Sequence, residues 1–278
     1  MRWMLLSVLM LGGGARASAA LHAEAVEYRD GEVILEGYVA YDDAMQGARP
    51  GVLVVHEWMG LGPYAMRRAD QLARLGYAAF AADMYGKGIR AKDHTEAAQL
   101  SGAYRKDRAL MRARIAAALE TFRRMPFVDA ERIAAIGYCF GGTTVLELAR
   151  SGADVLGVAS FHGGLDTPDP ADARRIRGRV LVLHGADDPF VPQAQVAALE
   201  QEMQQAGVSY RVVQYPGAVH SFTVTEAGDD PSKGMAYNEA ADAASWQELV
   251  TFLAEMFQRP QSMHADHGDH TPHAGHDG

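Results

Sequence analysis

The sequence predicts an α/β fold in which a mostly parallel β-sheet carries helices on both faces. Short apolar runs rich in β-branched residues, such as 51–56 and 180–184, are typical of strands buried on both faces of a parallel sheet. These runs alternate with longer segments of helical spacing, as in successive strand–helix–strand units. The chain has 278 residues, of which 48% are hydrophobic, so it can bury one large core. Because it shows no internal repeat and no second core, we expect a single domain over 24–260.

The net charge and the length of the apolar runs limit the classes of partner. The formal net charge of −9 argues against nucleic acid and anionic membranes as main partners. No run reaches the roughly 18 apolar residues that span a bilayer. We therefore expect a monomer that acts on a small molecule, without a nucleic acid partner and without a membrane partner in its mature form.

Residues 1–20 have the composition of a secretory signal peptide. A basic residue, Arg2, precedes an apolar segment over 3–11, and the small residues at 17–20 offer cleavage sites. We expect cleavage between about Ala19 and Ala23, with an uncleaved anchor or a misassigned start as the alternatives. The mature protein is then exported, most simply to the periplasm. In such an oxidising compartment a lone cysteine has no intramolecular partner, so its presence calls for a chemical reason.

The first part of the domain predicts a hairpin and one strand–helix unit. Residues 24–41 alternate weakly around a polar turn at 29–32, which indicates two antiparallel strands. The β-branched run 51–56 is a buried strand, and the helix that follows over 64–75 ends at Gly76.

A second unit follows with a short strand at 77–82 and a long helical stretch over 94–124. The apolar stripe of this stretch is predicted to face the core, whereas its arginines lie mostly off the stripe and are expected to face solvent. The residues of the stripe are Met111, Ile115, Ala118, Leu119 and Phe122.

The second half of the domain repeats the alternation of strands and helices. Its elements are predicted from buried apolar runs and from helical spacing in the same way. They are strands at 133–138, 155–161, 180–184 and 210–215, and helices at 143–150, 193–206 and 237–257.

The turn at 137–142, with the sequence G-Y-C-F-G-G, joins a buried strand directly to a helix. G-x-C-x-G at such a junction has the pattern of the nucleophile elbow of an α/β-hydrolase fold, with a thiol in place of the usual serine. The turn strains the backbone of Cys139, and Gly137 and Gly141 provide room for it. The sulfur would lie near the N-terminus of the helix, where the helix dipole favours a thiolate. The alternative is an ordinary buried thiol beside a glycine-rich junction.

Two further groups follow later strands in the chain order of nucleophile, acid and histidine. Asp187 and Asp188 come directly after the strand 180–184, and His220 follows the strand 210–215. Because functional groups of such sheets lie at the carboxyl ends of the strands, we expect them on the same rim as Cys139. Either aspartate can be the acid, and a turn role for one of them or an incidental His220 remains an alternative.

These groups predict a cysteine hydrolase. His220 would take the thiol proton and an aspartate would orient its ring, and the thiolate would attack an ester carbonyl to form an acyl-enzyme that water hydrolyses. Backbone N–H groups of Phe140 and Trp58 would hold the oxyanion. We expect an ester or lactone as substrate and not a peptide, because amides need protonation of a poor leaving group. A thioesterase or acyltransferase with the same triad is an alternative.

Four segments together resemble the dienelactone hydrolase (carboxymethylenebutenolidase) family. They are the elbow at 137–142, H-G-A-D-D-P-F-V-P at 184–192, Y-P-G-A-V-H-S-F at 215–222 and H-E-W at 56–58. The resemblance covers nearly the whole mature domain. It implies that the acid is Asp188, which stands four residues before the proline of D-x-x-V-P. It also implies that the Glu57 carboxylate pairs with the resting thiol and swings away when substrate binds.

The chain departs from the family at the site for a substrate carboxylate. The resemblance implies two arginines there, but Lys87 and Val224 occupy the two positions. Lysine lacks the bidentate fork of arginine and valine has no charge, so we expect an altered site and an uncharged or monoanionic ester. We expect Lys87, Tyr85 and Phe222 to bind substrate. Several aromatic residues indicate an apolar pocket, with a core position as the alternative for each: Trp58, Tyr85, Tyr138, Phe140 and Phe222.

Residues 261–278 differ in composition from the domain. Histidines recur at every third position among Asp, Gly and Pro, which predicts a disordered tail that can bind zinc, copper or nickel weakly. These residues are His264, His267, His270, His273 and His276. The alternatives are a merely soluble tail, a cloning remnant, or a metal-handling protein that acts through this tail. No cofactor is expected for catalysis.

Overall fold

The structure is a computed structural model of the chain and describes residues 21–258. The predicted signal peptide and the histidine-rich tail lie outside the described residues. Within 21–258, no helix is long and apolar enough to cross a membrane.

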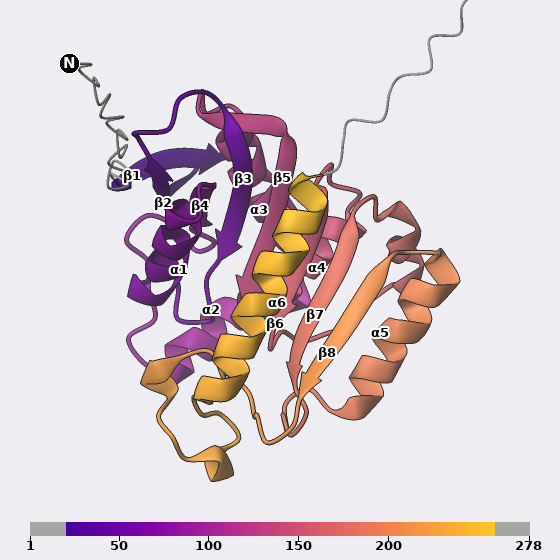
Figure 1. Cartoon of the computed structure of the whole chain (residues 1–278). Coiled ribbons are helices and arrows are strands. Elements are labelled where there is room, and N and C mark those ends of the chain that lie inside the picture. Colours follow the sequence, from indigo (N-terminus) through magenta and orange to yellow (C-terminus); the bar gives the residue numbers. More distant parts are fainter. Residues whose placement is uncertain (1–20, 259–278) are drawn as a thin grey trace, which may run out of the picture.

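One twisted sheet of eight strands forms the centre of the molecule, with helices on both faces (Figure 1). The strands follow in the order β1-β2-β4-β3-β5-β6-β7-β8, and all neighbours from β4 to β8 run parallel. The antiparallel hairpin of β1 and β2 joins the sheet beside β4. This arrangement confirms the predicted α/β-hydrolase fold. The strands are β1 Leu21–Asp30, β2 Val33–Asp42, β3 Arg49–Val55, β4 Ala78–Ala82, β5 Val128–Tyr138, β6 Gly157–Phe161, β7 Arg179–Gly185 and β8 Tyr210–Tyr215.

The helices divide between the two faces and form two apolar layers. Helices α1 and α6 cover one face, and α3, α4 and α5 cover the other. Since the inner strands are buried on both faces, their side chains contribute alternately to both layers. The helices are α1 Pro63–Arg74, α2 His94–Lys106, α3 Arg108–Arg123, α4 Phe140–Arg150, α5 Gln193–Ala206 and α6 Glu239–Phe257, with short 3-10 turns η1 Pro170–Arg175, η2 Thr225–Ala227 and η3 Pro231–Lys233.

The long helical stretch predicted over 94–124 is broken at Asp107. Its backbone leaves the helical region there, and its side chain accepts a hydrogen bond from the Leu110 N–H, which caps the start of α3. The expectation that the arginines of this stretch face solvent was wrong for Arg108 and Arg114, which are buried. Arg114 pairs with Asp30 at 2.8 Å, so a partner on β1 accounts for its burial.

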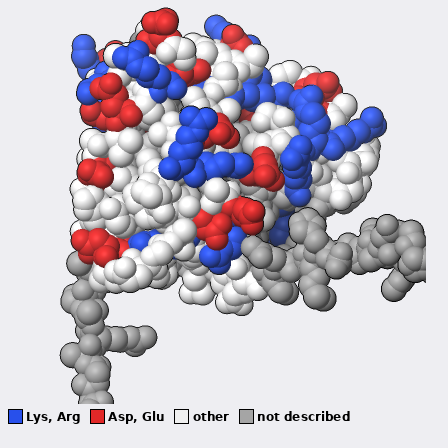
Figure 2. Space-filling view, turned by 90° about the horizontal axis from the view of Figure 1, so that it is seen from above, with Lys and Arg blue, Asp and Glu red and all other residues white. Residues whose placement is uncertain are grey.

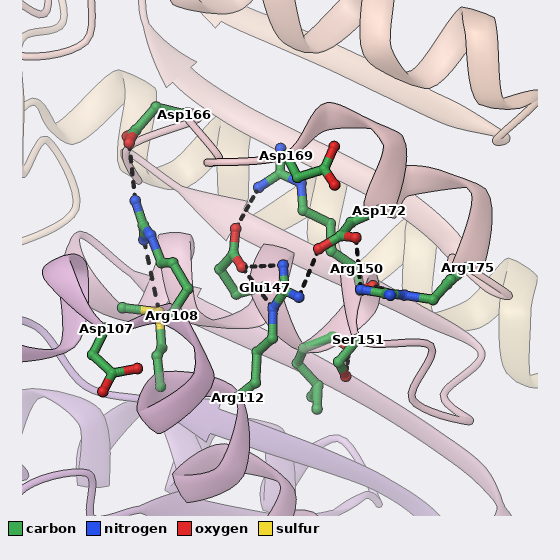
Figure 3. Close-up of polar contacts among 12 residues, drawn as sticks. Asp107, Arg108, Arg112, Glu147, Arg150, Ser151, Asp166, Asp169, Asp172 and Arg175 are labelled. Carbon is green, nitrogen blue, oxygen red and sulfur yellow. Dashed lines mark hydrogen bonds and ion pairs between the residues drawn. The ribbon is translucent and has the colours of Figure 1, made fainter.

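A buried ion network fixes the C-terminal end of α4 (Figure 3). Arg150 is fully buried and pairs with Glu147 at 3.1 Å and with Glu202 of α5 at 2.7 Å. Arg112 of α3 pairs with Glu147 at 2.6 Å and with Asp172 at 2.7 Å. The network therefore joins α4, the helix that follows Cys139, to α3, α5 and η1.

Charged side chains of both signs are interspersed on the face seen in Figure 2. This face therefore offers no extended single-sign patch of the kind that attracts nucleic acid.

Candidate active site

The turn between β5 and α4 holds Cys139 in a strained conformation. Its φ of 54° and ψ of −113° lie in a region that residues with a side chain rarely adopt. Two glycines make this turn possible. A Cβ on Gly137 would lie 2.0 Å from the Gly141 carbonyl oxygen, and one on Gly141 would lie 2.3 Å from the Val55 carbonyl oxygen. The thiol therefore stands at the start of α4, above the end of the strand.

Cys139, His220 and Asp188 form one hydrogen-bonded row. The Nε2 atom of His220 lies 3.1 Å from the Cys139 sulfur, and its Nδ1 lies 2.8 Å from Asp188 Oδ2. The other carboxylate oxygen of Asp188 accepts the N–H groups of Phe190 and Val191, which hold it in place. The carboxylate of Asp187 instead accepts a hydrogen bond from the Gly217 N–H, so it stabilises the turn that follows β8.

The charges around His220 favour its protonated form. Burial by itself would lower its pKa, but Cys139 and Asp188 outweigh burial and raise the pKa of His220 to about 10. A histidine held in this way is suited to accept a thiol proton and to remain an imidazolium beside a thiolate. The Phe140 N–H, at the first position of α4, has no acceptor within the helix and is free to bind a negatively charged oxygen.

A cavity of about 300 Å³ opens beside the thiol. Trp58 and the half-exposed Phe190 supply aromatic walls, and two arginines, Arg105 and Arg108, supply positive charge. Its other lining residues are Cys139, Thr143, Gly164, Asp166, Val191, Gln195, His220, Ser221 and Met235. A single helix over 94–124 with its basic residues in solvent does not predict two arginines at this cavity, so the sequence did not identify them.

Tyr85 lies behind the cavity wall. Its hydroxyl donates to the Trp58 carbonyl at 2.9 Å, and its ring packs against His56 and Phe140. Burial raises the pKa of Tyr85 well above its usual range, so it remains a neutral donor. It thus anchors the Trp58 loop, and it does not line the cavity as a substrate-binding residue would.

Three other residues that were expected at the site lie elsewhere. Lys87 is exposed, and its ammonium pairs with Glu27 at 2.9 Å and Glu36 at 3.1 Å, away from the cavity. Phe222 is fully buried, where its ring packs against His162, so the expectation that it binds substrate was wrong. Val224 faces a separate pocket.

That separate pocket, of about 260 Å³, is also lined by Glu57 and Glu226. The Cys139 thiol has His220 as its hydrogen-bonding partner, and Glu57 lines the wall of the other pocket. Burial raises the pKa of the Glu57 carboxyl to about 7, against the opposing effect of His220. Glu57 is therefore poised to change its charge near neutral pH.

A second histidine, His162, lies beneath the elbow and was not singled out from the sequence. It is fully buried at the end of β6 with a φ of 38°. Its Nδ1 accepts the Cys139 N–H at 3.2 Å, and its Nε2 donates to Thr223 Oγ1 at 2.8 Å. Burial lowers the pKa of His162, so the ring is neutral and connects the elbow to the loop that carries His220. A polar residue directly after a buried strand was the signal that could have identified it.

Within residues 21–258, no group of three or more histidine, cysteine, aspartate or glutamate side chains is arranged to hold a metal ion. The five histidines predicted to bind metal lie outside this part of the chain.

Comparison with known proteins gives a consistent result. The profile of the dienelactone hydrolase family matches residues 35–257. A protein of Synechocystis that is provisionally named carboxymethylenebutenolidase is 27% identical over 239 residues, which cover 77% of this chain and 89% of the relative. These relatives do not favour the thioesterase, acyltransferase or metal-handling alternatives.

Solved structures agree with this result. One described as a dienelactone hydrolase-like promiscuous phosphotriesterase from metagenomic libraries is 42% identical, with a TM-score of 0.82, and covers 86% of this chain and 99% of its own. Dienelactone hydrolase of Anabaena variabilis shares the fold at 21% identity and a TM-score of 0.63, with 86% of this chain and 99% of its own covered. The chain belongs to the dienelactone hydrolase family and is a hydrolase of the α/β-hydrolase fold.

Proposed function

We propose that the protein hydrolyses a carboxylic ester or lactone through a triad of Cys139, His220 and Asp188. The observation that carries this proposal is the hydrogen-bonded row of the three side chains, with distances of 3.1 and 2.8 Å, at the wall of the cavity. The family supports hydrolysis, and the row supports these three side chains as the groups that perform it.

The reaction begins with transfer of the thiol proton to His220 Nε2. The thiolate attacks the carbonyl carbon of the ester or lactone, and the charge that develops on its oxygen is stabilised by the N–H groups of Phe140 and Trp58. When the C–O bond breaks, the imidazolium returns the proton to the leaving oxygen. Water then attacks the thioester with His220 as base, which releases the acid and restores the thiol. Asp188 orients the imidazole and stabilises its charge throughout.

Glu57 is proposed to control the resting thiol. With its side chain on the wall of the neighbouring pocket, the thiol is free to pair with His220, which is the arrangement needed for attack. In the alternative arrangement the carboxylate would pair with the thiol and keep it protonated. The placement of Lys87 and Val224 outside the cavity supports a substrate-binding site that differs from the carboxylate site implied by the resemblance.

The proposed reaction is tested with a panel of 4-nitrophenyl esters, an enol lactone, dienelactone and a peptide amide. A neutral phosphotriester belongs to the panel because the relative at 42% identity is described as a phosphotriesterase. We expect ester or lactone turnover that falls at least about 1000-fold in Cys139→Ala. Asp188→Asn should also be severely impaired, whereas the matched variant Asp187→Asn should retain activity. Turnover that survives in Cys139→Ala, or hydrolysis of the amide alone, would refute the proposal.

Export to the periplasm and metal binding by the tail are also proposed. The first rests on the composition of residues 1–20 and the second on the spacing of the tail histidines. Fractionation of cells that express the full chain should place a shortened protein in the periplasm, and an unshortened protein in the cytoplasm would refute export. Calorimetry with zinc should give more heat for the full chain than for one that ends at Pro260, and equal heats would refute metal binding.

A further inference from the structure

The cavity beside Cys139 carries two arginines that the proposed reaction does not use. Arg105 is exposed in the last turn of α2, and Arg108 is the first residue of α3. Asp107 interrupts the helix between them, and both side chains line the cavity. The break in the helix therefore brings two guanidinium groups to the wall of one substrate pocket.

The guanidinium of Arg108 has N–H donors that lack a strong acceptor, although the residue is only 9% exposed. Its Nη2 pairs with Asp166 Oδ2 at 2.9 Å, and its Nη1 has only the Met111 sulfur at 3.8 Å (Figure 3). A thioether is a weak acceptor, and the Nε has no partner among the described residues. Burial of a charged group with incomplete hydrogen bonding is costly, so a further acceptor at this guanidinium would be strongly favoured.

The remaining charges on the cavity wall favour an anion. Arg105 lines the cavity and makes no salt bridge within residues 21–258, so no carboxylate of the described residues pairs with its charge. Among the described residues, Asp166 is the one carboxylate that lines the cavity, and its side chain is 61% exposed although it contacts Arg108. The exposed carboxylate of Asp166 therefore occupies a place on the buried guanidinium of Arg108 that the anionic group of a substrate can take instead.

Resting on the proposed function, we infer that Arg105 and Arg108 bind a carboxylate carried by the ester or lactone substrate, and that Asp166 competes for Arg108. The specificity of this enzyme for an anionic substrate would then come from the junction of α2 and α3. Lys87 and Val224 do not provide this specificity, because Lys87 pairs with two glutamates and Val224 faces the neighbouring pocket.

The test compares substrates that differ only in charge. Mono-4-nitrophenyl glutarate and its neutral methyl ester place the charge on the acyl side, and 4-acetoxybenzoate and its methyl ester place it on the leaving group. The quantity measured is the ratio of kcat/KM for the anionic and the neutral member of each pair. Arg105→Gln and Arg108→Gln should lower this ratio about 10-fold or more for at least one pair through a higher KM, since each variant loses a charge-assisted hydrogen bond to the substrate carboxylate.

Asp166→Asn should change the ratio in the opposite direction, with a lower KM for the same anionic ester. A gain of this kind cannot arise from damage to the fold. Lys106→Gln removes a neighbouring positive charge from α2 outside the cavity, and Lys87→Gln tests the position implied by the family. Both should leave the ratio within about twofold, because exposed charges are screened by water and salt.

The inference and the proposed function fail in different ways. Absence of Cys139-dependent turnover for every ester of both pairs would refute the proposed function. Neutral esters that are hydrolysed normally, with ratios unaffected by Arg105→Gln, Arg108→Gln and Asp166→Asn for both pairs, would refute the inference alone. A ratio that falls in Lys87→Gln as far as in the arginine variants would also refute it.

Discussion

Replacement of Glu57 by glutamine should remove a pH dependence of stability that its buried carboxyl creates. Burial raises the pKa of Glu57 from its ordinary value of 4.5 to about 7. A carboxyl with a raised pKa binds its proton more tightly in the folded state. The stabilisation is therefore complete below pH 4.5 and is lost as the pH rises through about 7. The full effect of this shift is roughly 3 kcal/mol, and most of it falls between pH 5 and pH 8.

The assay is urea unfolding of wild type and Glu57→Gln at pH 5, 6, 7 and 8. The variant keeps a neutral side chain of the same shape at every pH, so the titrations of groups that do not interact with Glu57 cancel in the difference. Relative to wild type, its free energy of unfolding should rise by roughly 2–3 kcal/mol from pH 5 to pH 8. The matched control is Glu226→Gln, which lines the same pocket. Arg67 and other partners hold the pKa of Glu226 below its usual value despite partial burial. The difference in free energy of unfolding between Glu226→Gln and wild type should therefore stay constant from pH 5 to pH 8.

Parallel pH profiles for wild type and Glu57→Gln would refute the reasoning, because they would mean that Glu57 is ionised in the folded protein at pH 5. A rise of equal size in the Glu226→Gln variant would also refute it.

Three further variants test the packing around the site. Arg150→Met leaves its two glutamate partners in the core and should cost about 3–5 kcal/mol in urea unfolding, whereas a loss below about 1 kcal/mol would show that the buried network adds little. Gly141→Ala brings a Cβ within 2.3 Å of a backbone oxygen and should yield little folded protein by circular dichroism. The control Gly102→Ala meets nothing within 4 Å and should raise the free energy of unfolding by up to about 1 kcal/mol. Equal behaviour of the two variants would contradict the strained elbow. His162→Asn should lower kcat and displace the acid limb of the pH–rate profile, because the elbow and the loop of His220 lose their connection. An unchanged pH–rate profile in His162→Asn would refute the positioning role.

Much of the fold was predictable from local signals. Buried strands of a parallel sheet are read from continuous apolar runs, and the order of strands and helices then restricts the topology. The elbow at Cys139 could be predicted because a strand that turns at once into a helix needs glycine at fixed positions. The choice of Asp188 over Asp187 came only from the resemblance, and the hydrogen bonds of the two carboxylates account for it.

The cavity could not be predicted, because it depends on contacts between distant segments. Lys87 stands at the expected place in the chain, but two glutamates from β1 and β2 hold it outside the cavity. Arg108 continues the buried stripe of α3, three residues before Met111 and seven before Ile115, but its charge made a solvent-facing position the natural expectation. Phe222 was indistinguishable from a cavity residue, since aromatic side chains serve cores and pockets equally well.

The nucleophile itself is tested most directly by intact-mass and peptide mass spectrometry of the protein quenched during turnover of a 4-nitrophenyl ester. The account predicts a covalent acyl group on the peptide that contains Cys139, which is absent in Cys139→Ala. Ser221 also lines the cavity beside His220 and provides the competing nucleophile. An acyl group on Ser221, or steady turnover by Cys139→Ala at the wild-type rate, would contradict the assignment of Cys139.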